Sequence, residues 1–509
     1  IDSFWGEIKA KEERVFGVAP DKVLALPLTN KYGSFRGGYF PIKFSRDFSG
    51  KSFQQGQADI FDKMKAGAFG HATTARAHTK ARLDAAGEKP IHLSFDVIFE
   101  HITAVVHDLA WHENLRDTSK LLNDKRITDS IIDNQGVEVL GELQNGLQDI
   151  AAGDMQGISR MDQVFNYLRS GVSIAAMGWN LGTALLQPFG ITQGMVRVGP
   201  KWVMKGMNQW IGSAARMQSV TDDMYAESSF MRMRAKTMNR EINEIQNKVG
   251  TAGFTGKAAL QMRQSFFSMI VKAQLIADTP IWLGAKEKAL AGNFSVPEAI
   301  AQADQAVIDS QGSGHIKDLA GAQRGSPLKK LFTNFMSYFQ TTFNLTVDSF
   351  TRTKFNSLSD ILQLGSDLFF LYSMPIILQH FVREAWIKGS CDYGADIECS
   401  IEKIGADHVS YAMGGIIGIR ELNSIVSGFY GYQGPAGARI FSDAGRFAQQ
   451  VGQGELDEKF ALATLRLSGG ALHFPSGQVE KLLRGYMDIQ DGKTGNILAP
   501  LFGRDRSND

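Results

Sequence analysis

Cysteine is the scarcest informative residue in this 509-residue chain, which contains only Cys391 and Cys399. Two cysteines cannot form the disulfide framework that holds small secreted domains together, so the fold must depend on a hydrophobic core. Both lie in an acidic, glycine-containing loop, either as two free thiols or as one local disulfide, which would require an oxidising compartment. Because no CxxC spacing exists and His408 is the only histidine nearby, we expect no zinc site.

An excess of either charge is also missing. The 54 Lys and Arg residues nearly balance the 53 Asp and Glu residues, so bulk attraction to nucleic acid or anionic lipid is not expected to dominate. Hydrophobic residues make up 43% of the chain and charged residues 21%, which excludes an intrinsically disordered protein. The first residues carry no apolar leader, and because Ile1 replaces an initiator methionine we expect a processed product or a fragment of a longer polypeptide.

Proline is rare as well, with 13 residues, whereas glycine is abundant, with 53. No collagen period or low-complexity tract accounts for the glycines, so they must lie inside structured segments. Helices that carry much glycine are either tightly packed or marginally stable. The glycines concentrate in the uncharged stretches 170–196 and 408–438, where we expect close helix packing and conformational change.

Apolar residues recur at three- and four-residue spacing through most of the chain, which predicts helices. The exception is 23–44, where apolar residues alternate with turn residues, as in a short hairpin or extended arm. We therefore predict a mainly α fold, an elongated multi-helix assembly with a short β or extended N-terminal arm. Its expected parts are the arm (1–60), a helical region (61–169), a long-helix region with uncharged segments (170–360), an apolar glycine-rich helical region (361–445), and a C-terminal helix and tail (446–509).

The uncharged segment 170–196 is long enough to cross a bilayer. Its polar residues and Pro188 make it a poor transmembrane helix, and Gly190 and Gly194 form a GxxxG pair of the kind found at close helix contacts. It is either a buried hairpin that breaks at Pro188-Phe189-Gly190 or a membrane-active segment.

Two further segments, 328–347 and 368–382, combine aromatic residues with few charges. A basic flank followed by an aromatic helical face is typical of an interfacial or partner-binding helix, although a buried core helix has the same stripe. We predict that these segments and 170–196 contact membrane or other subunits. The candidate contact residues are Trp179, Phe189, Gly190, Gly194, Phe332, Phe335, Phe339, Phe343, Phe369 and Phe370.

Enzyme signatures fail on their spacing. Gly256-Lys257 lacks both the upstream glycine and the following Ser or Thr of a phosphate-binding loop. His107 and His112 are five apart rather than four, so His112 is expected to be a core or interface histidine rather than a zinc ligand. We therefore predict no enzyme in this chain, with no catalytic residue, cofactor or metal, although a catalytic domain could lie on a missing N-terminal part.

A short basic stripe is the one candidate for DNA contact. Arg232, Lys236 and Arg240 fall at i, i+4 and i+8 of one predicted helix face. A solvated helix face has the same pattern, because Glu241 and Glu244 follow directly. An oligomer would be needed to place such stripes along a channel that holds DNA.

An ordered series of phrases carries a resemblance. They are Gly37–Ile42 (GGYFPI), 107–122 (HDLAWHENLRDTSKLL), 182–194 (GTALLQPFGITQG), 303–340, 415–424 (GIIGIRELNS) and 474–485 (FPSGQVEKLLRG). Together they resemble the C-terminal parts of very large tailed-phage proteins, the internal virion and polyvalent proteins carried in the particle. The resemblance covers most of residues 23–500.

The resemblance implies a structural virion protein that is ejected with the genome and oligomerises into a conduit for DNA across the host cell envelope. Its partners would be copies of itself, other ejection proteins, the portal and tail, phage double-stranded DNA and the host inner membrane. It would lie in the virion interior and, after ejection, in the host periplasm and inner membrane. The alternative is a scaffold or DNA-protecting polyvalent segment that is injected with phage DNA and has no membrane role.

Overall fold

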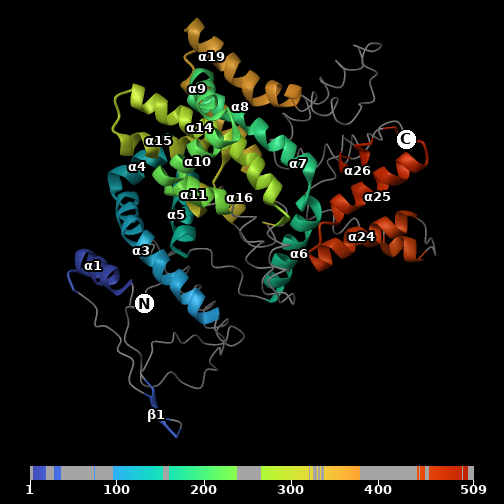
Figure 1. Cartoon of the computed structure of the whole chain (residues 1–509). Coiled ribbons are helices and arrows are strands. Elements are labelled where there is room, and N and C mark those ends of the chain that lie inside the picture. Colours follow the sequence, from blue (N-terminus) through green and yellow to red (C-terminus); the bar gives the residue numbers. More distant parts are fainter. Residues whose placement is uncertain are drawn as a thin grey trace. The chain divides into compact units, whose positions relative to one another are not determined.

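A computed structural model of the chain shows a mainly α protein, as predicted (Figure 1). It describes residues 4–18, 28–31, 33–35, 74, 96–152, 160–237, 265–313, 315–319, 321–324, 330, 333, 337–378, 444–445, 447–452, 458–495 and 497–502. The chain divides into two compact units, Ile1–Gln163 and Val164–Asp509. The five-part division expected from the sequence stays a prediction.

The N-terminal arm contains both strand and helix. Strands β1 (Leu28–Asn30) and β2 (Gly33–Phe35) pair antiparallel, with Leu28 opposite Phe35, inside the stretch predicted to form a hairpin. Helix α1 (Trp5–Phe16) corrects the expectation of a wholly extended arm. The helix forms because one face, which includes Ile8, Lys11 and Glu12, is buried and Gly17 ends it in the left-handed conformation.

Three helices complete the described part of the first unit. They are α3 (Asp96–Leu122), α4 (Lys125–Gln135) and α5 (Val137–Ala152). Asp124 starts α4 by accepting a hydrogen bond from the amide of Arg126. Gly136, with φ of 93°, separates α4 from α5.

A buried polar cluster joins α1 to α3. The Lys11 ammonium pairs with the Asp108 carboxylate, and Thr74 Oγ1 lies 2.9 Å from His112 Nδ1 and hydrogen bonds to the same carboxylate. All four side chains are buried, so the pairing offsets the desolvation of each group. His112 is therefore a hydrogen-bonded core histidine, as its place on the apolar stripe indicated.

The second unit begins with helices α6 (Arg160–Met177), α7 (Leu181–Leu186), the 3₁₀ turn η3 (Gln187–Gly190) and α8 (Ile191–Val198). The sequence suggested a hairpin that breaks at Pro188, and this is wrong. The backbone keeps right-handed helical angles from Leu186 through Ile191, because proline is tolerated in the first turn of a helical segment. The change of direction comes earlier, at Trp179, which has a φ of 53°.

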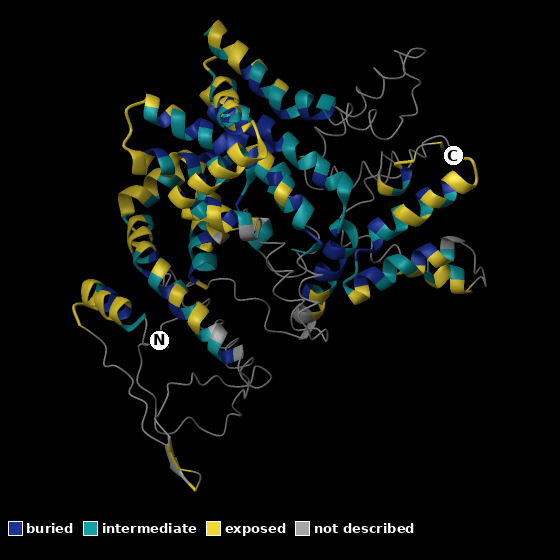
Figure 2. Cartoon of the chain, in the orientation of Figure 1, coloured by how far each residue is buried: buried dark blue, intermediate teal, exposed yellow. Residues whose placement is uncertain are grey.

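The core of the second unit forms around α14 (Ser268–Ala291), which packs against α9 (Pro200–Trp210) and α15 (Val296–Gln311) (Figure 1). Helices α10 (Ala214–Glu227) and α11 (Ser229–Thr237) supply Met224 and Met231 to the same core. Eleven of the 24 residues of α14 are buried, whereas α10 buries Met224 alone, and Figure 2 shows dark blue concentrated at the centre of this group of helices. The short elements η4 (Ile316–Asp318) and α16 (Gly321–Arg324) follow α15.

Glycine lets two of these helices meet backbone to backbone. A Cβ added at Gly206 on α9 would lie 2.2 Å from the carbonyl oxygen of Pro280 on α14. A Cβ added at Gly284 would lie 2.4 Å from the carbonyl oxygen of Trp202. Since no side chain fits at either position, glycine permits this close crossing, in helices outside the two segments for which such packing was expected.

The C-terminal helices α24 (Glu458–Leu472), α25 (Ser476–Gln490) and α26 (Ala499–Phe502) use glycine in the same way. A Cβ at Gly171 on α6 would lie 1.8 Å from the carbonyl oxygen of Gly470, and the Tyr167 hydroxyl donates to the carbonyl oxygen of Ala471. The C-terminal helices are therefore docked onto α6 largely through main-chain contacts.

Candidate partner-contacting surfaces

Helices α18 (Ser337–Arg352) and α19 (Leu358–Leu368) form an antiparallel hairpin, and the π-helix η5 (Phe369–Ser373) continues α19. Ser349 contacts Asp367, Thr346 contacts Tyr372, and Leu345 packs with Leu371. From Ser349 back to Thr346 the partner moves forward from Asp367 to Tyr372, which fixes the antiparallel order. A π-turn is expected here because Pro375 cannot donate to the carbonyl one turn earlier.

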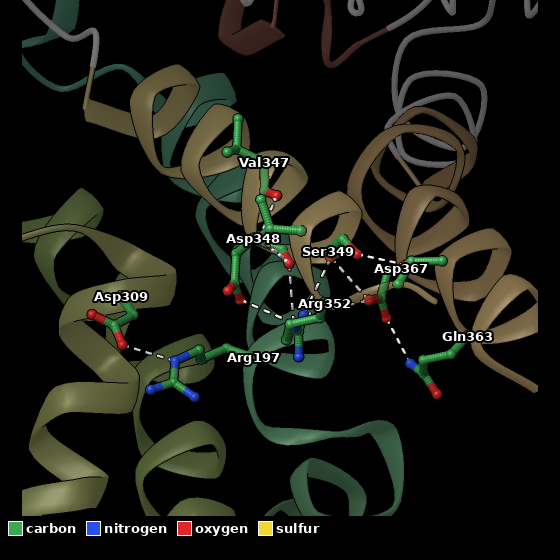
Figure 3. Close-up of polar contacts among 10 residues, drawn as sticks. Arg197, Asp309, Val347, Asp348, Ser349, Arg352, Gln363 and Asp367 are labelled. Carbon is green, nitrogen blue, oxygen red and sulfur yellow. Dashed lines mark hydrogen bonds and ion pairs between the residues drawn. The ribbon is translucent and has the colours of Figure 1, made fainter. Parts of the chain in front are cut away.

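The inner face of this hairpin is polar. Asp367, which is 4% exposed, accepts hydrogen bonds from Ser349 Oγ at 2.9 Å and from Gln363 Nε2 at 2.7 Å (Figure 3). The Arg352 guanidinium lies 3.6 Å from the same carboxylate and 3.2 Å from that of Asp348. The buried carboxylate is thus surrounded by donors, which is the condition for keeping a charge away from water.

A second ion pair lies beside this cluster on helices α8 and α15. Arg197 Nε donates to Asp309 Oδ2 at 2.7 Å (Figure 3). Burial, followed by the positive charges of Arg197 and Arg352, lowers the pKa of Lys288, whose ammonium donates to the carbonyl oxygen of Val198. The inner side of the hairpin therefore meets a polar and partly charged part of the unit.

Other polar groups of α18 are also turned inward. Gln193 on α8 is 1% exposed and donates to Thr342 Oγ1 at 2.6 Å. Thr341 and Thr342 are buried and donate to main-chain carbonyl oxygens one turn earlier. The apolar contact on this side is the small cluster of Val196, Leu345 and Leu371.

Seven large apolar side chains of the hairpin are exposed, beside polar ones such as Asn344, Asp348 and Gln363. Leu358 is 73% exposed and Leu362 is 66% exposed, and Figure 3 shows the Val347 side chain directed away from the polar cluster. We call this set of exposed side chains the hairpin surface: Phe343, Val347, Phe350, Leu358, Ile361, Leu362 and Phe369. Exposed apolar side chains over buried polar ones reverse the usual order of a water-soluble helix.

One continuous helix of 21 residues, Leu358–Leu378, contains α19 and η5. Within the described ranges it is the one helix long and apolar enough to cross a membrane, and 28% of its apolar window is buried. By length and composition alone a core helix of a soluble protein can pass the same test, but such a helix is mostly buried. The sequence segment 368–382 is the second half of this helix.

A smaller reversed helix lies near the C-terminus. Helix α25 buries Ser476, Gln478 and Asp488 against the rest of the unit. On its other side it exposes four side chains at helical spacing, which we call the α25 stripe: Leu482, Leu483, Tyr486 and Ile489. Arg484 forms an ion pair with Glu480, and the Lys481 ammonium donates to Asn180 Oδ1. The four side chains of the stripe itself carry no charge.

The candidate residues of the first uncharged segment contact their own unit. Trp179 stacks edge-on against Phe266 and donates from its indole to Ser265. A Cβ at Gly194 would lie 2.3 Å from Ile281, and one at Gly190 would lie 2.3 Å from Gln311. Phe189 is half-buried in η3. The structure does not bring these residues to the hairpin surface.

Some of the phenylalanines predicted to contact membrane or other subunits do belong to the hairpin surface. Phe343 and Phe369 belong to the hairpin surface, whereas Phe339 and Phe370 are half-buried. Phe332 and Phe335 lie outside the described residues, as do Cys391, Cys399 and the glycine-rich stretch 408–438. The proposed disulfide and the membrane or subunit contacts therefore stay predictions.

The basic stripe is only partly placed. Arg232 is exposed on α11, Lys236 belongs to the same helix without a described side chain, and Arg240 lies outside the described residues. Sequence reasoning missed the role of the neighbouring Arg234. Its guanidinium is buried, donates to Asp278 at 2.7 Å and donates to the carbonyl oxygen of Gly312 at 2.7 Å.

Sequence reasoning also missed the buried carboxylate of Asp367 and the α25 stripe. Asp367 interrupts an apolar run four residues after Gln363, and this spacing brings an amide donor to the carboxylate on one helix face. The four apolar residues of the α25 stripe were readable as an amphipathic pattern, but nothing in the pattern tells which face is turned inward.

Comparison of the chain with protein-family models, with curated proteins and with solved structures yields no match.

Proposed function

We propose that this chain is a structural protein of a tailed-phage virion that is ejected with the genome and oligomerises into a conduit for DNA across the host cell envelope. The observation that supports it is the presence of two apolar faces, the hairpin surface and the α25 stripe, turned away from the chain over buried polar groups. The phage context comes from the ordered sequence phrases that resemble internal virion and polyvalent proteins.

The two faces suit the two contacts that a conduit needs. Exposed apolar patches on soluble proteins mark sites of protein or membrane contact, because leaving them in water is unfavourable. The α25 stripe is neutral and helical, as expected of a contact between copies of the chain. Several side chains of the hairpin surface lie on the long apolar helix Leu358–Leu378. A helix of this length and composition suits the host inner membrane.

The remaining partners follow from the same proposal. Copies arranged around an axis would each present the exposed Arg232 helix, and such a ring is the arrangement that could line a passage for double-stranded DNA. Other ejection proteins, the portal and the tail would contact the chain inside the virion. After ejection the chain would lie in the periplasm and inner membrane.

A second candidate is an injected scaffold or DNA-protecting polyvalent segment without a membrane role. The neutral α25 stripe favours it, since a protein-binding stripe alone is enough for a scaffold. The two candidates differ in what the hairpin surface does. A scaffold would assemble equally well with and without lipid.

Imaging the purified chain with vesicles of phosphatidylethanolamine and phosphatidylglycerol tests the conduit. Closed rings or tubes embedded in the vesicles support it, and dispersed monomers under every condition contradict it. The double variant Leu483→Glu, Tyr486→Glu should abolish the assemblies, because it places charges in the α25 stripe. Ser219→Glu, at an exposed position of α10, is the control and should assemble normally.

A further inference from the structure

We propose that the hairpin surface binds an anionic lipid bilayer, with Leu358–Leu378 in the hydrocarbon and α18 covering its polar side. This deepens the proposed function, on which it rests for its biological setting, by naming the partner of this surface. The inference itself depends on the distribution of polar and apolar groups in the hairpin.

Lipid explains the reversed polarity of the hairpin better than a soluble partner does. In a bilayer every polar group must be satisfied within the protein, because no water is present to do it. The hairpin meets this condition at Asp367, which has Ser349 and Gln363 as donors, and at Thr346, whose hydroxyl lies 2.9 Å from that of Tyr372. Polar and ionisable residues of membrane helices face the protein interior in the same way.

Length supports the same occupant. A helix of 21 residues is about 32 Å long, close to the hydrocarbon thickness of about 30 Å. Asp367 falls near the middle of Leu358–Leu378, where an unpaired charge would be most costly. Helix α18 has 16 residues, about 24 Å, and reaches past this carboxylate to Leu345. Helix α18 therefore extends along α19 far enough to shield the Asp367 carboxylate from the hydrocarbon.

The connection between the two helices fits the membrane–water interface. Lys354 and Phe355 lie there, and Phe355 is 65% exposed. Basic and aromatic side chains at the end of an apolar helix anchor it among lipid headgroups, and basic ones favour anionic lipid. Asp360 lies in the first turn of α19, near the same end, so no acidic side chain of the helix other than the paired Asp367 would enter the hydrocarbon.

Site-specific fluorescence tests this proposal on the full chain. In a background with Cys391→Ser and Cys399→Ser, an environment-sensitive dye is attached at Leu362→Cys on the hairpin surface. The control position is Gln302→Cys, which is exposed on α15. With phosphatidylglycerol-containing vesicles the dye at position 362 should shift to the blue and be quenched by nitroxide-labelled acyl chains, whereas the dye at 302 should be quenched only by iodide in water.

A charge variant provides a second measurement. Leu362→Glu should reduce vesicle flotation about tenfold or more, because it puts an unpaired charge in the hydrocarbon. Thr351→Glu, an exposed position on α18, should float like the unmodified chain. Both positions are exposed without lipid, so circular dichroism melting curves should be unchanged.

Absence of nitroxide quenching at position 362, or flotation that Leu362→Glu leaves unchanged, would overturn the lipid assignment. These outcomes are separate from the fate of the conduit. Lipid quenching without rings or tubes would leave this proposal standing and remove the conduit. Rings or tubes without quenching at 362 would keep the conduit and assign the hairpin surface to protein contact.

Discussion

The Ser349 hydroxyl on α18 donates a hydrogen bond of 2.9 Å to the buried Asp367 carboxylate on α19, between two helices whose other faces are apolar and exposed. This contact holds the hairpin closed on its polar side. A carboxylate at this position is unfavourable unless its donors stay in place, so the stability of the hairpin depends on a few polar groups more than on apolar packing.

Asp367→Ala should destabilise the chain by about 1–3 kcal/mol, because Ser349 and Gln363 lose their acceptor in a buried site. Asp348→Ala is the matched control, since Asp348 pairs with the same Arg352 but is half-exposed. Its cost should stay within about 0.5 kcal/mol. Urea unfolding followed by circular dichroism measures both, and equal losses for the two variants would contradict a special role for Asp367.

Gly206→Ala should destabilise the second unit by roughly 1–3 kcal/mol, because its Cβ would enter the space of the Pro280 carbonyl oxygen and force α9 away from α14. Gly365→Ala provides the contrast. Nothing lies within 4 Å of a Cβ at that helical position, so the change should stabilise α19 by about 0.5–1 kcal/mol. Thermal unfolding compares the two, and a harmless Gly206→Ala would refute the close crossing.

Arg234→Ala should cost about 3–5 kcal/mol, because it leaves the fully buried Asp278 carboxylate without its cation. Arg232→Ala, two residues earlier and exposed, should change the free energy of unfolding by less than about 0.5 kcal/mol. Denaturant unfolding of both variants measures the difference in their free energies of unfolding. Similar midpoints would mean that the Arg234–Asp278 pair adds nothing to stability.

The same Arg232→Ala variant tests DNA contact. If Arg232 lies against phosphate, the change should weaken binding to double-stranded DNA irrespective of sequence and lower the slope of log affinity against log salt by about 1. Fluorescence anisotropy over a salt series measures the slope. An unchanged slope and affinity would remove Arg232 from the proposed DNA-facing stripe.

The stability of the second unit should depend on pH through Asp304. Burial raises the pKa of this carboxyl, against the opposing hydrogen bonds from Ser228 and Trp282. The folded state therefore takes up the proton first as the pH falls. The resulting stabilisation is complete below the unfolded pKa and is lost as pH rises through the folded value.

Asp304→Asn keeps an acceptor for both donors but cannot titrate. Relative to this variant, the unmodified chain should gain stability as the pH falls from 7 toward 4, although both lose stability from other carboxyls. Urea unfolding at several pH values gives the difference between the two curves. A difference that shrinks or stays constant as the pH falls would contradict the raised pKa.

Sequence spacing was sufficient for the helical class and for the core position of His112, since both depend on local pattern. It failed at α1, where the buried face includes Lys11 and Glu12. A lysine in a predicted helix indicates solvent, and only its partner Asp108, 97 residues away, makes its burial possible.

The candidate surfaces show the same limit more strongly. The aromatic spacing of Phe343 and Phe350 was readable, but the face that carries Ser349 looked like the solvated one. Its burial depends on Asp367, on another helix, and a one-dimensional pattern contains no information about such a pair. For the same reason, the sequence could not show which face of α25 is buried.

The contact between Tyr167 and Ala471 joins residues 304 positions apart. Whichever end of the chain enters a compartment first, α6 cannot meet α24 until nearly all of the second unit has arrived. Distant contacts of this kind form slowly, because the intervening chain must be closed into a loop. The docking of the C-terminal helices is therefore a late event in folding, and in the proposed ejection it would follow the passage of nearly the whole second unit.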